Sequence, residues 1–111
     1  MTELAGKTCT PCRGGVPPMG QAEAERYLQE APGWALMDQG TRIERTFKLR
    51  NFKEALALVN RIGALAEEEG HHPDIAFGWG YVTVALHTHK LKGLHENDFI
   101  MAAKINRLAE G

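Results

Sequence analysis

The chain lacks any apolar run near the roughly 18 residues that a membrane-spanning helix needs. Its first residues also lack the charged and then apolar pattern of a signal peptide. Only two of the 111 residues are cysteines, and the formal net charge is -1. A balance this close to neutral gives no general basic field for nucleic acid. These absences predict a cytoplasmic protein that binds neither membranes nor nucleic acid.

The two cysteines, Cys9 and Cys12, form a single C-x-x-C in a segment rich in glycine and proline. Two thiolates are fewer than the four ligands of a structural zinc site, and a redox role would need a thioredoxin-like strand and helix around them. A local disulfide or pairing across a dimer stays open. We expect both cysteines to lie outside the chemistry.

The rest of the composition is that of one globular domain, with 43% hydrophobic and 24% charged residues. A domain of this length can bury only a small core, so association into an oligomer would help its stability. Prolines and glycines predict an irregular arm over residues 1–18 and a single domain over 19–111. Sequence patterns predict helices over 19–30, 51–70 and 96–109 and strands over 34–37, 42–49, 74–77 and 81–88. This order predicts an α+β fold, a four-stranded, mainly antiparallel sheet with three helices on one face.

The middle helix carries the clearest boundary signals. Asn51 suits an N-cap, with Glu54 in capping-box position, and Gly70 is a natural end. Apolar residues recur at three- and four-residue steps: Phe52, Ala55, Leu56, Val59, Ile62 and Ala66. In the last strand, alternation places Val82, Val84 and Leu86 toward the helices and His87 and His89 on the other face.

Histidines gather around the end of this middle helix. Glu67-Glu68-Glu69-Gly70 leads into His71-His72-Pro73, and His89 follows in the next strand region. Imidazole titrates near neutral pH, so three of them predict proton-transfer chemistry. His71 and His72 are consecutive and should point in opposite directions in extended chain. Solvated histidines at a strand end, or a zinc site of His71, His89 and Glu67, remain alternatives.

Two acids accompany the histidines. Glu67 lies in the last turn of a helix, where the helix dipole disfavours negative charge, and this placement is consistent with a carboxylate that orients an imidazole. Asp98 lies in the first turn of the last helix, where acids are favoured anyway. Its position is therefore explained without any chemistry.

Together these residues resemble the pterin-4a-carbinolamine dehydratase family. The likeness is carried by Glu67-x-x-x-His71-His72-Pro73-Asp74, Thr88-His89, Gly93-Leu94 and Asp98, and upstream by Pro32-Gly33-Trp34, Ile43-x-Arg45-Thr46-Phe47 and Phe52-x-x-Ala55. The Cys-x-x-Cys-Arg-Gly-Gly-Val-Pro-Pro opening is similar to that of bacterial members. The likeness covers nearly the whole chain.

The resemblance implies dehydration of 4a-hydroxytetrahydropterin to the quinonoid dihydropterin, a step that recycles the cofactor of aromatic amino-acid hydroxylases. It implies a homodimer or homotetramer and no metal or cofactor, since the pterin is the substrate. Carried over by position, His71 and His89 transfer protons and His72 holds the pterin. Glu67, Pro73 and Asp98 complete the implied binding residues.

The sequence departs from the family pattern at Lys90 and Lys92, which could change the charge of the pocket. It also departs at His95, which replaces the usual Ser or Thr and is expected to remove an N-cap worth about 1 kcal/mol. Two other functions stay open. One is a non-catalytic assembly module, like the family's transcription coactivator or RuBisCO-assembly relatives. The other is binding of another pterin, such as a molybdopterin, without dehydrating it.

Overall fold

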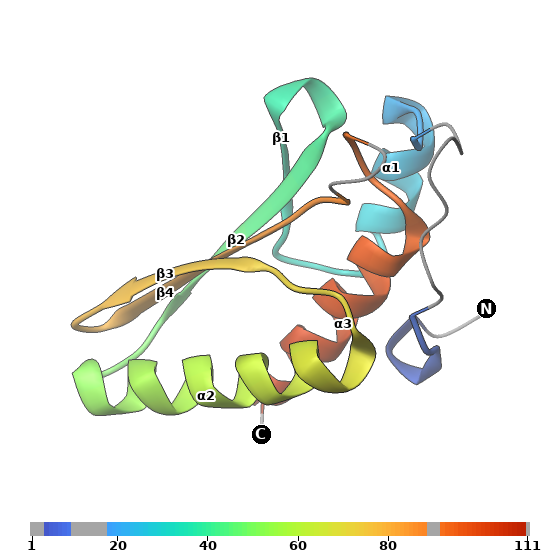
Figure 1. Ribbon diagram of the computed structural model, residues 1–111. Helices are drawn as coiled ribbons and strands as arrows, with labels where there is room; N and C mark the ends of the chain where they lie inside the picture. The colour runs from blue at the N-terminus through green and yellow to red at the C-terminus, as the bar shows by residue number, and fades with distance from the viewer. Residues whose placement is uncertain (1–3, 10–17, 89–91, 111) are drawn as a thin grey trace.

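The computed structural model describes residues 4–9, 18–88 and 92–110 of the chain (Figure 1). Within them the elements follow the predicted order. They are the 3₁₀-helix η1 (Leu4–Gly6), α1 (Gln21–Leu28), β1 (Ala35–Met37), the 3₁₀-helix η2 (Asp38–Gly40), β2 (Arg42–Lys48), α2 (Phe52–Glu69), β3 (Asp74–Gly78), β4 (Tyr81–Leu86) and α3 (Glu96–Glu110).

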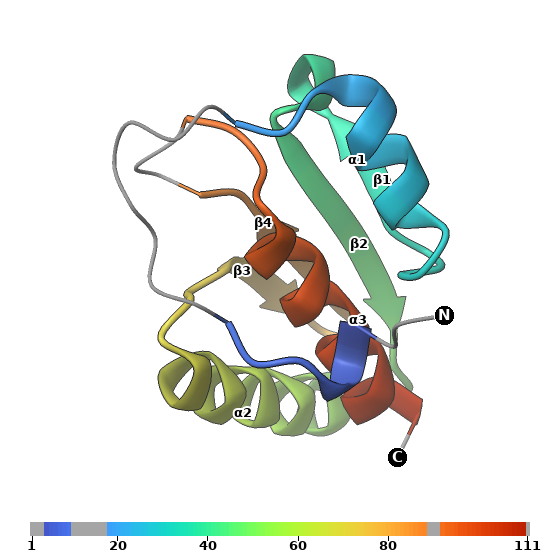
Figure 2. The ribbon, with the colours of Figure 1, turned by 90° about the vertical axis from the view of Figure 1, so that its right-hand side faces the viewer.

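The four strands form one antiparallel sheet in the order β1-β2-β4-β3. The helices cover one face of it, as the two ribbon views show (Figures 1 and 2). The prediction of an α+β fold with three helices on one face is confirmed. No helix in the described part of the chain is long and apolar enough to cross a membrane.

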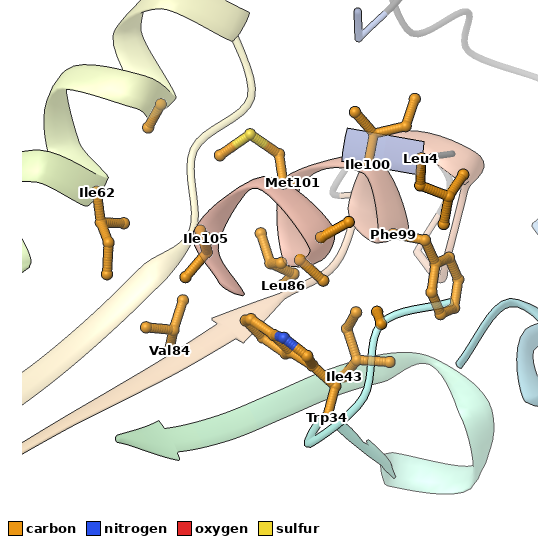
Figure 3. Packing of buried hydrophobic residues seen from close by; sticks show 14 of the residues in the cluster. Leu4, Trp34, Ile43, Ile62, Val84, Leu86, Phe99, Ile100, Met101 and Ile105 are labelled. Carbon is orange, nitrogen blue, oxygen red and sulfur yellow. The ribbon is translucent and has the colours of Figure 1, made fainter. Parts of the chain in front are cut away.

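The core lies between the sheet and the helices, and α3 runs through its centre (Figure 3). Val82, Val84 and Leu86 are fully buried there, as the alternation of β4 predicted. The strand itself ends at Leu86, two residues before the predicted end. Because α3 is enclosed by the sheet and by neighbouring helices, it buries residues on most of its circumference.

The predicted ends of α2 are confirmed, but the prediction of which of its residues are buried was partly wrong. The Asn51 side chain accepts a hydrogen bond from the Glu54 N–H at 2.9 Å, and Gly70 ends the helix in the left-handed region with φ 68°. The residues that α2 buries are Ala55, Leu58, Ile62 and Ala66. Leu56 and Phe52, which were expected on this face, are exposed. Leucines on both sides of the stripe made two rotations of the helix compatible with the pattern.

A buried polar group joins the turn before β1 to the end of α3. The Asn106 Oδ1 accepts hydrogen bonds from Trp34 Nε1 at 2.8 Å and from Arg45 Nη1 at 2.6 Å. The Asn106 Nδ2 donates to the Pro32 carbonyl at 2.9 Å, and the Arg45 guanidinium lies 4.4 Å from the centre of the Phe47 ring. One amide oxygen therefore satisfies a buried donor of the turn before β1 and a partly buried donor of β2.

Replacing Asn106 with leucine is expected to lower the free energy of unfolding by about 2–4 kcal/mol, because Trp34 Nε1 and the Arg45 guanidinium lose their shared acceptor. Urea denaturation of both proteins measures the difference. The matched control is Asn60→Leu, at an exposed position of α2, with an expected change within about 0.5 kcal/mol. Equal stability of the two variants would contradict a structural role for this amide.

Candidate active site

The candidate site forms where four element ends meet: the end of α2, the start of β3, the chain just after β4, and the first turn of α3. His71 and His72 lie between α2 and β3. Thr88 follows β4 and forms an isolated bridge with Gly93. Asp98 lies in the first turn of α3. Segments far apart in the sequence therefore supply the side chains of one small region.

Asp98 is at the centre of this region. Its side chain is 0% exposed, and its carboxylate accepts three hydrogen bonds. The donors are His71 Nε2 to Oδ1 at 2.7 Å, the Thr88 hydroxyl to Oδ2 at 2.8 Å and the His95 backbone N–H to Oδ2 at 3.0 Å. A buried carboxylate needs such partners. The explanation of Asp98 by the helix dipole alone was therefore incomplete, since this residue holds three segments together.

His95 does not have the effect that was expected of it. Its Nδ1 accepts a hydrogen bond from the Asn97 N–H at 3.1 Å, while Asp98 accepts from the His95 N–H. The imidazole thus caps the second residue of α3, and the Asp98 carboxylate reaches back to the N-cap N–H as the acid of a capping box does. The prediction that His95 removes the N-cap was wrong, because a ring nitrogen can accept as a serine oxygen does.

His71 is held firmly and faces Asp98. The left-handed Gly70 turns the chain, so the His71 N–H donates to the Ala66 carbonyl at 3.2 Å. Its side chain is only 12% exposed. An ionised carboxylate can only accept, so this hydrogen bond assigns the proton of the neutral ring to Nε2. Nδ1 is then the nitrogen that can exchange a proton with a substrate.

His72 points the other way, as expected for consecutive residues in extended chain. Its Nε2 is paired with a carboxylate oxygen of Glu67. Both side chains are well exposed, at 61% for His72 and 78% for Glu67. The structure thus brings Glu67 to His72 and Asp98 to His71, with half-buried Pro73 next in the chain.

His89, the third predicted histidine, and Lys90 lie outside the described residues, as does Cys12. His87 lies near the Asp74 carboxylate, with 3.9 Å between His87 Nδ1 and Asp74 Oδ2. Among residues 4–9, 18–88 and 92–110, no group of three or more His, Cys, Asp or Glu side chains could hold a metal ion.

Sequence reasoning gave no role to Thr88, although it belongs to the Thr88-His89 motif. Thr88 is buried and donates to Asp98. The one available signal was its position beside a candidate catalytic histidine, because a threonine hydroxyl can donate to a neighbouring carboxylate.

Residues 17–108 match the family model described as pterin 4 alpha carbinolamine dehydratase. The chain belongs to this family. A curated protein of Cupriavidus pinatubonensis, provisionally named pterin-4-alpha-carbinolamine dehydratase 1, is 59% identical over 98% of this chain and 94% of its own length. The resemblance that the His71-His72-Pro73 and Thr88-His89 motifs suggested is confirmed.

Two solved structures extend the likeness to three dimensions. A transcriptional coactivator/pterin dehydratase from Brucella melitensis is 32% identical, with a TM-score of 0.78 over 83% of this chain and 98% of that one. A pterin dehydratase-like protein identified as a RuBisCO assembly factor in the alpha-carboxysome is 28% identical, with a TM-score of 0.61 over 70% of this chain and 90% of that one. The family fold therefore serves proteins with different described functions.

Proposed function

We propose that this protein dehydrates 4a-hydroxytetrahydropterin to the quinonoid dihydropterin by histidine acid–base catalysis. The reaction removes the C4a hydroxyl and the N5 proton as one water molecule and leaves a double bond between N5 and C4a. Hydroxide is a poor leaving group, so an acid must protonate the hydroxyl while a base takes the N5 proton. The pterin supplies the electron pair, so these steps need only two groups that exchange protons.

The observation that carries the proposal is His71 held on the buried Asp98 carboxylate at 2.7 Å. A carboxylate behind an imidazole fixes the tautomer and the ring orientation, and it stabilises the imidazolium that forms when Nδ1 takes a proton. His71 and His89 are the proposed proton-transfer pair. His72, with Glu67 behind it, and Pro73 are proposed to hold the pterin ring. We propose that the protein acts in the cytoplasm as a homodimer or homotetramer and serves a pterin-dependent hydroxylase.

A second candidate is a non-catalytic assembly module, which the RuBisCO assembly factor among the structural relatives favours. Such a role needs the fold, and with it Asp98, but it makes no demand for a group that exchanges protons at His71 Nδ1. The His71 imidazole, partly exposed and oriented by the buried Asp98 carboxylate, supports the enzyme instead.

The test is the decay of freshly generated 4a-hydroxytetrahydropterin, followed by absorbance with the purified protein and with buffer alone. The expected result is an acceleration of at least about 10²-fold, the lower range for one well-placed acid or base. The heat-denatured protein is the control, and it should leave the buffer rate unchanged. Decay at the buffer rate with native protein would overturn the enzyme proposal. Pterin binding without acceleration would then assign a binding role.

A further inference from the structure

A short segment near the start of the chain contacts the end of α2, which His71 follows, and the start of α3, which holds Asp98. Residues 4–9, here named the strap, run across α3 toward the last turn of α2 (Figure 2). Leu4 is buried in the core, where it lies beside Ile100 and Phe99 of α3 (Figure 3). The strap is therefore packed against the domain, and its far end comes close to the site.

Glu69 is the point where the strap meets α2. Its carboxylate accepts a hydrogen bond from the Cys9 backbone N–H at 2.8 Å and lies 3.3 Å from Lys104 Nζ of α3. The Glu69 side chain is only 6% exposed. The Cys9 N–H, and after it Lys104, lower the pKa of the Glu69 carboxyl against the effect of burial. The third acid of the run is thus a buried acceptor, unlike the exposed Glu67.

The strap also contacts the start of α3. Lys7 Nζ lies 2.7 Å from Glu96 Oε2, and the Cys9 thiol contacts the Asn97 carbonyl at 3.8 Å. Burial, with Glu69 adding to it, raises the pKa of Cys9 to about 12, so this sulfur stays a protonated donor near neutral pH. Glu96 and Asn97 directly precede Asp98, and Glu69 precedes His71 by two residues. The strap therefore links the two chain segments on which the site depends.

We propose that Glu69 is a positioning residue for the reaction: by holding the Cys9 N–H, it fixes the end of α2 against the start of α3 and keeps His71 on Asp98. The kinetic part rests on the proposed function, whereas the part about the His71–Asp98 hydrogen bond does not. A small displacement is sufficient for a large effect, because catalysis can fall about 10²-fold when a reacting group moves by about 1 Å.

The test compares Glu69→Ala with Glu68→Ala, the same change at the exposed neighbouring position. In Glu69→Ala the Cys9 amide should exchange its hydrogen at least ~10-fold faster, and the downfield NMR signal of the His71 Nε2 proton should weaken, since both hydrogen bonds depend on this carboxylate. We expect kcat to fall ~10-fold, within the range for a displaced catalytic group, with KM nearly unchanged. Glu68→Ala should behave as wild type in every measurement. Glu69→Gln, which keeps an oxygen for Cys9, should restore most of the signal and of kcat.

The pH dependence gives a second readout. Because the folded protein lowers the pKa of Glu69, this carboxylate stabilises the fold above its unfolded pKa of about 4.3, and the contribution is lost as the pH falls through the lower folded value. The stability difference between wild type and Glu69→Ala should therefore narrow below about pH 4.

A wild-type His71 signal together with a wild-type kcat in Glu69→Ala would overturn the proposal. If the wild type itself shows no dehydratase activity, the proposed function fails, and the NMR signal alone decides the positioning role. If Glu69→Ala does not fold, Cys9→Pro is measured instead, since proline at this position removes the N–H that Glu69 holds. An unchanged His71 signal in that variant would overturn the proposal equally.

Discussion

Replacing His71 with alanine is expected to slow the dehydration of 4a-hydroxytetrahydropterin about 10²–10⁴-fold, the range for loss of a positioned acid or base. The side chain is oriented by the Asp98 carboxylate at 2.7 Å, so its Nδ1 is fixed before substrate arrives. The change should appear mainly in kcat. Stopped-flow kinetics of wild type and variant measure it, with circular dichroism to check that the variant folds.

The other histidines provide the comparison. His89→Ala should lose activity to a similar degree if His89 is the second proton-transfer group. His72 is well exposed and faces Glu67, so His72→Ala should raise KM more than it lowers kcat. A His71→Ala variant with wild-type kcat would remove His71 from the chemistry, whatever the other two variants do.

The fold could be predicted where short-range patterns decide it. The alternation of Val82, Val84 and Leu86 gave the buried face of β4, and Asn51 and Gly70 gave both ends of α2. These signals are local, because a cap and a left-handed glycine act within one turn of the helix. The choice between Leu56 and Leu58 as the buried leucine was not local. It depends on how α2 is rotated against β3, β4 and α3, which a single helical pattern cannot specify.

The site likewise combines features that local sequence predicts with features that depend on packing. The motif around His71 and His72 drew attention to residues that the structure places at the candidate site, and their opposite directions followed from extended chain geometry. The importance of Asp98 was underestimated, because its three donors come from residues 71, 88 and 95 and only the last is near in sequence. Glu69 was equally hidden within a run of three glutamates. The side chain of Glu69 is buried, whereas that of Glu67 is exposed. The burial of Glu69 depends on the packing of the strap, which is distant in the sequence.

Exchanging Asp98 for asparagine is expected to lower kcat about 10²–10⁴-fold while the free energy of unfolding changes by about 1 kcal/mol or less. The asparagine oxygen can still accept from Thr88 and the His95 N–H. Its amide group would then face His71 Nε2 as a donor and move the ring proton to Nδ1. In serine-protease triads the same exchange lowers turnover about 10⁴-fold, because the imidazole takes the wrong tautomer.

Comparing Asp98→Ala with Asp98→Asn separates the effect of the carboxylate on catalysis from its effect on stability. Asp98→Ala leaves the Thr88 hydroxyl, the His95 N–H and His71 Nε2 without an acceptor at a fully buried position, so the free energy of unfolding should fall by about 2–4 kcal/mol. Asp38→Asn, at an exposed acid next to β1, is the matched control and should keep both stability and kcat. Denaturation and stopped-flow kinetics on the three variants measure both properties. If Asp98→Asn loses stability as Asp98→Ala does but keeps kcat, the carboxylate serves the fold alone. If it keeps stability and loses kcat, the buried carboxylate acts on the reaction through the tautomer of His71.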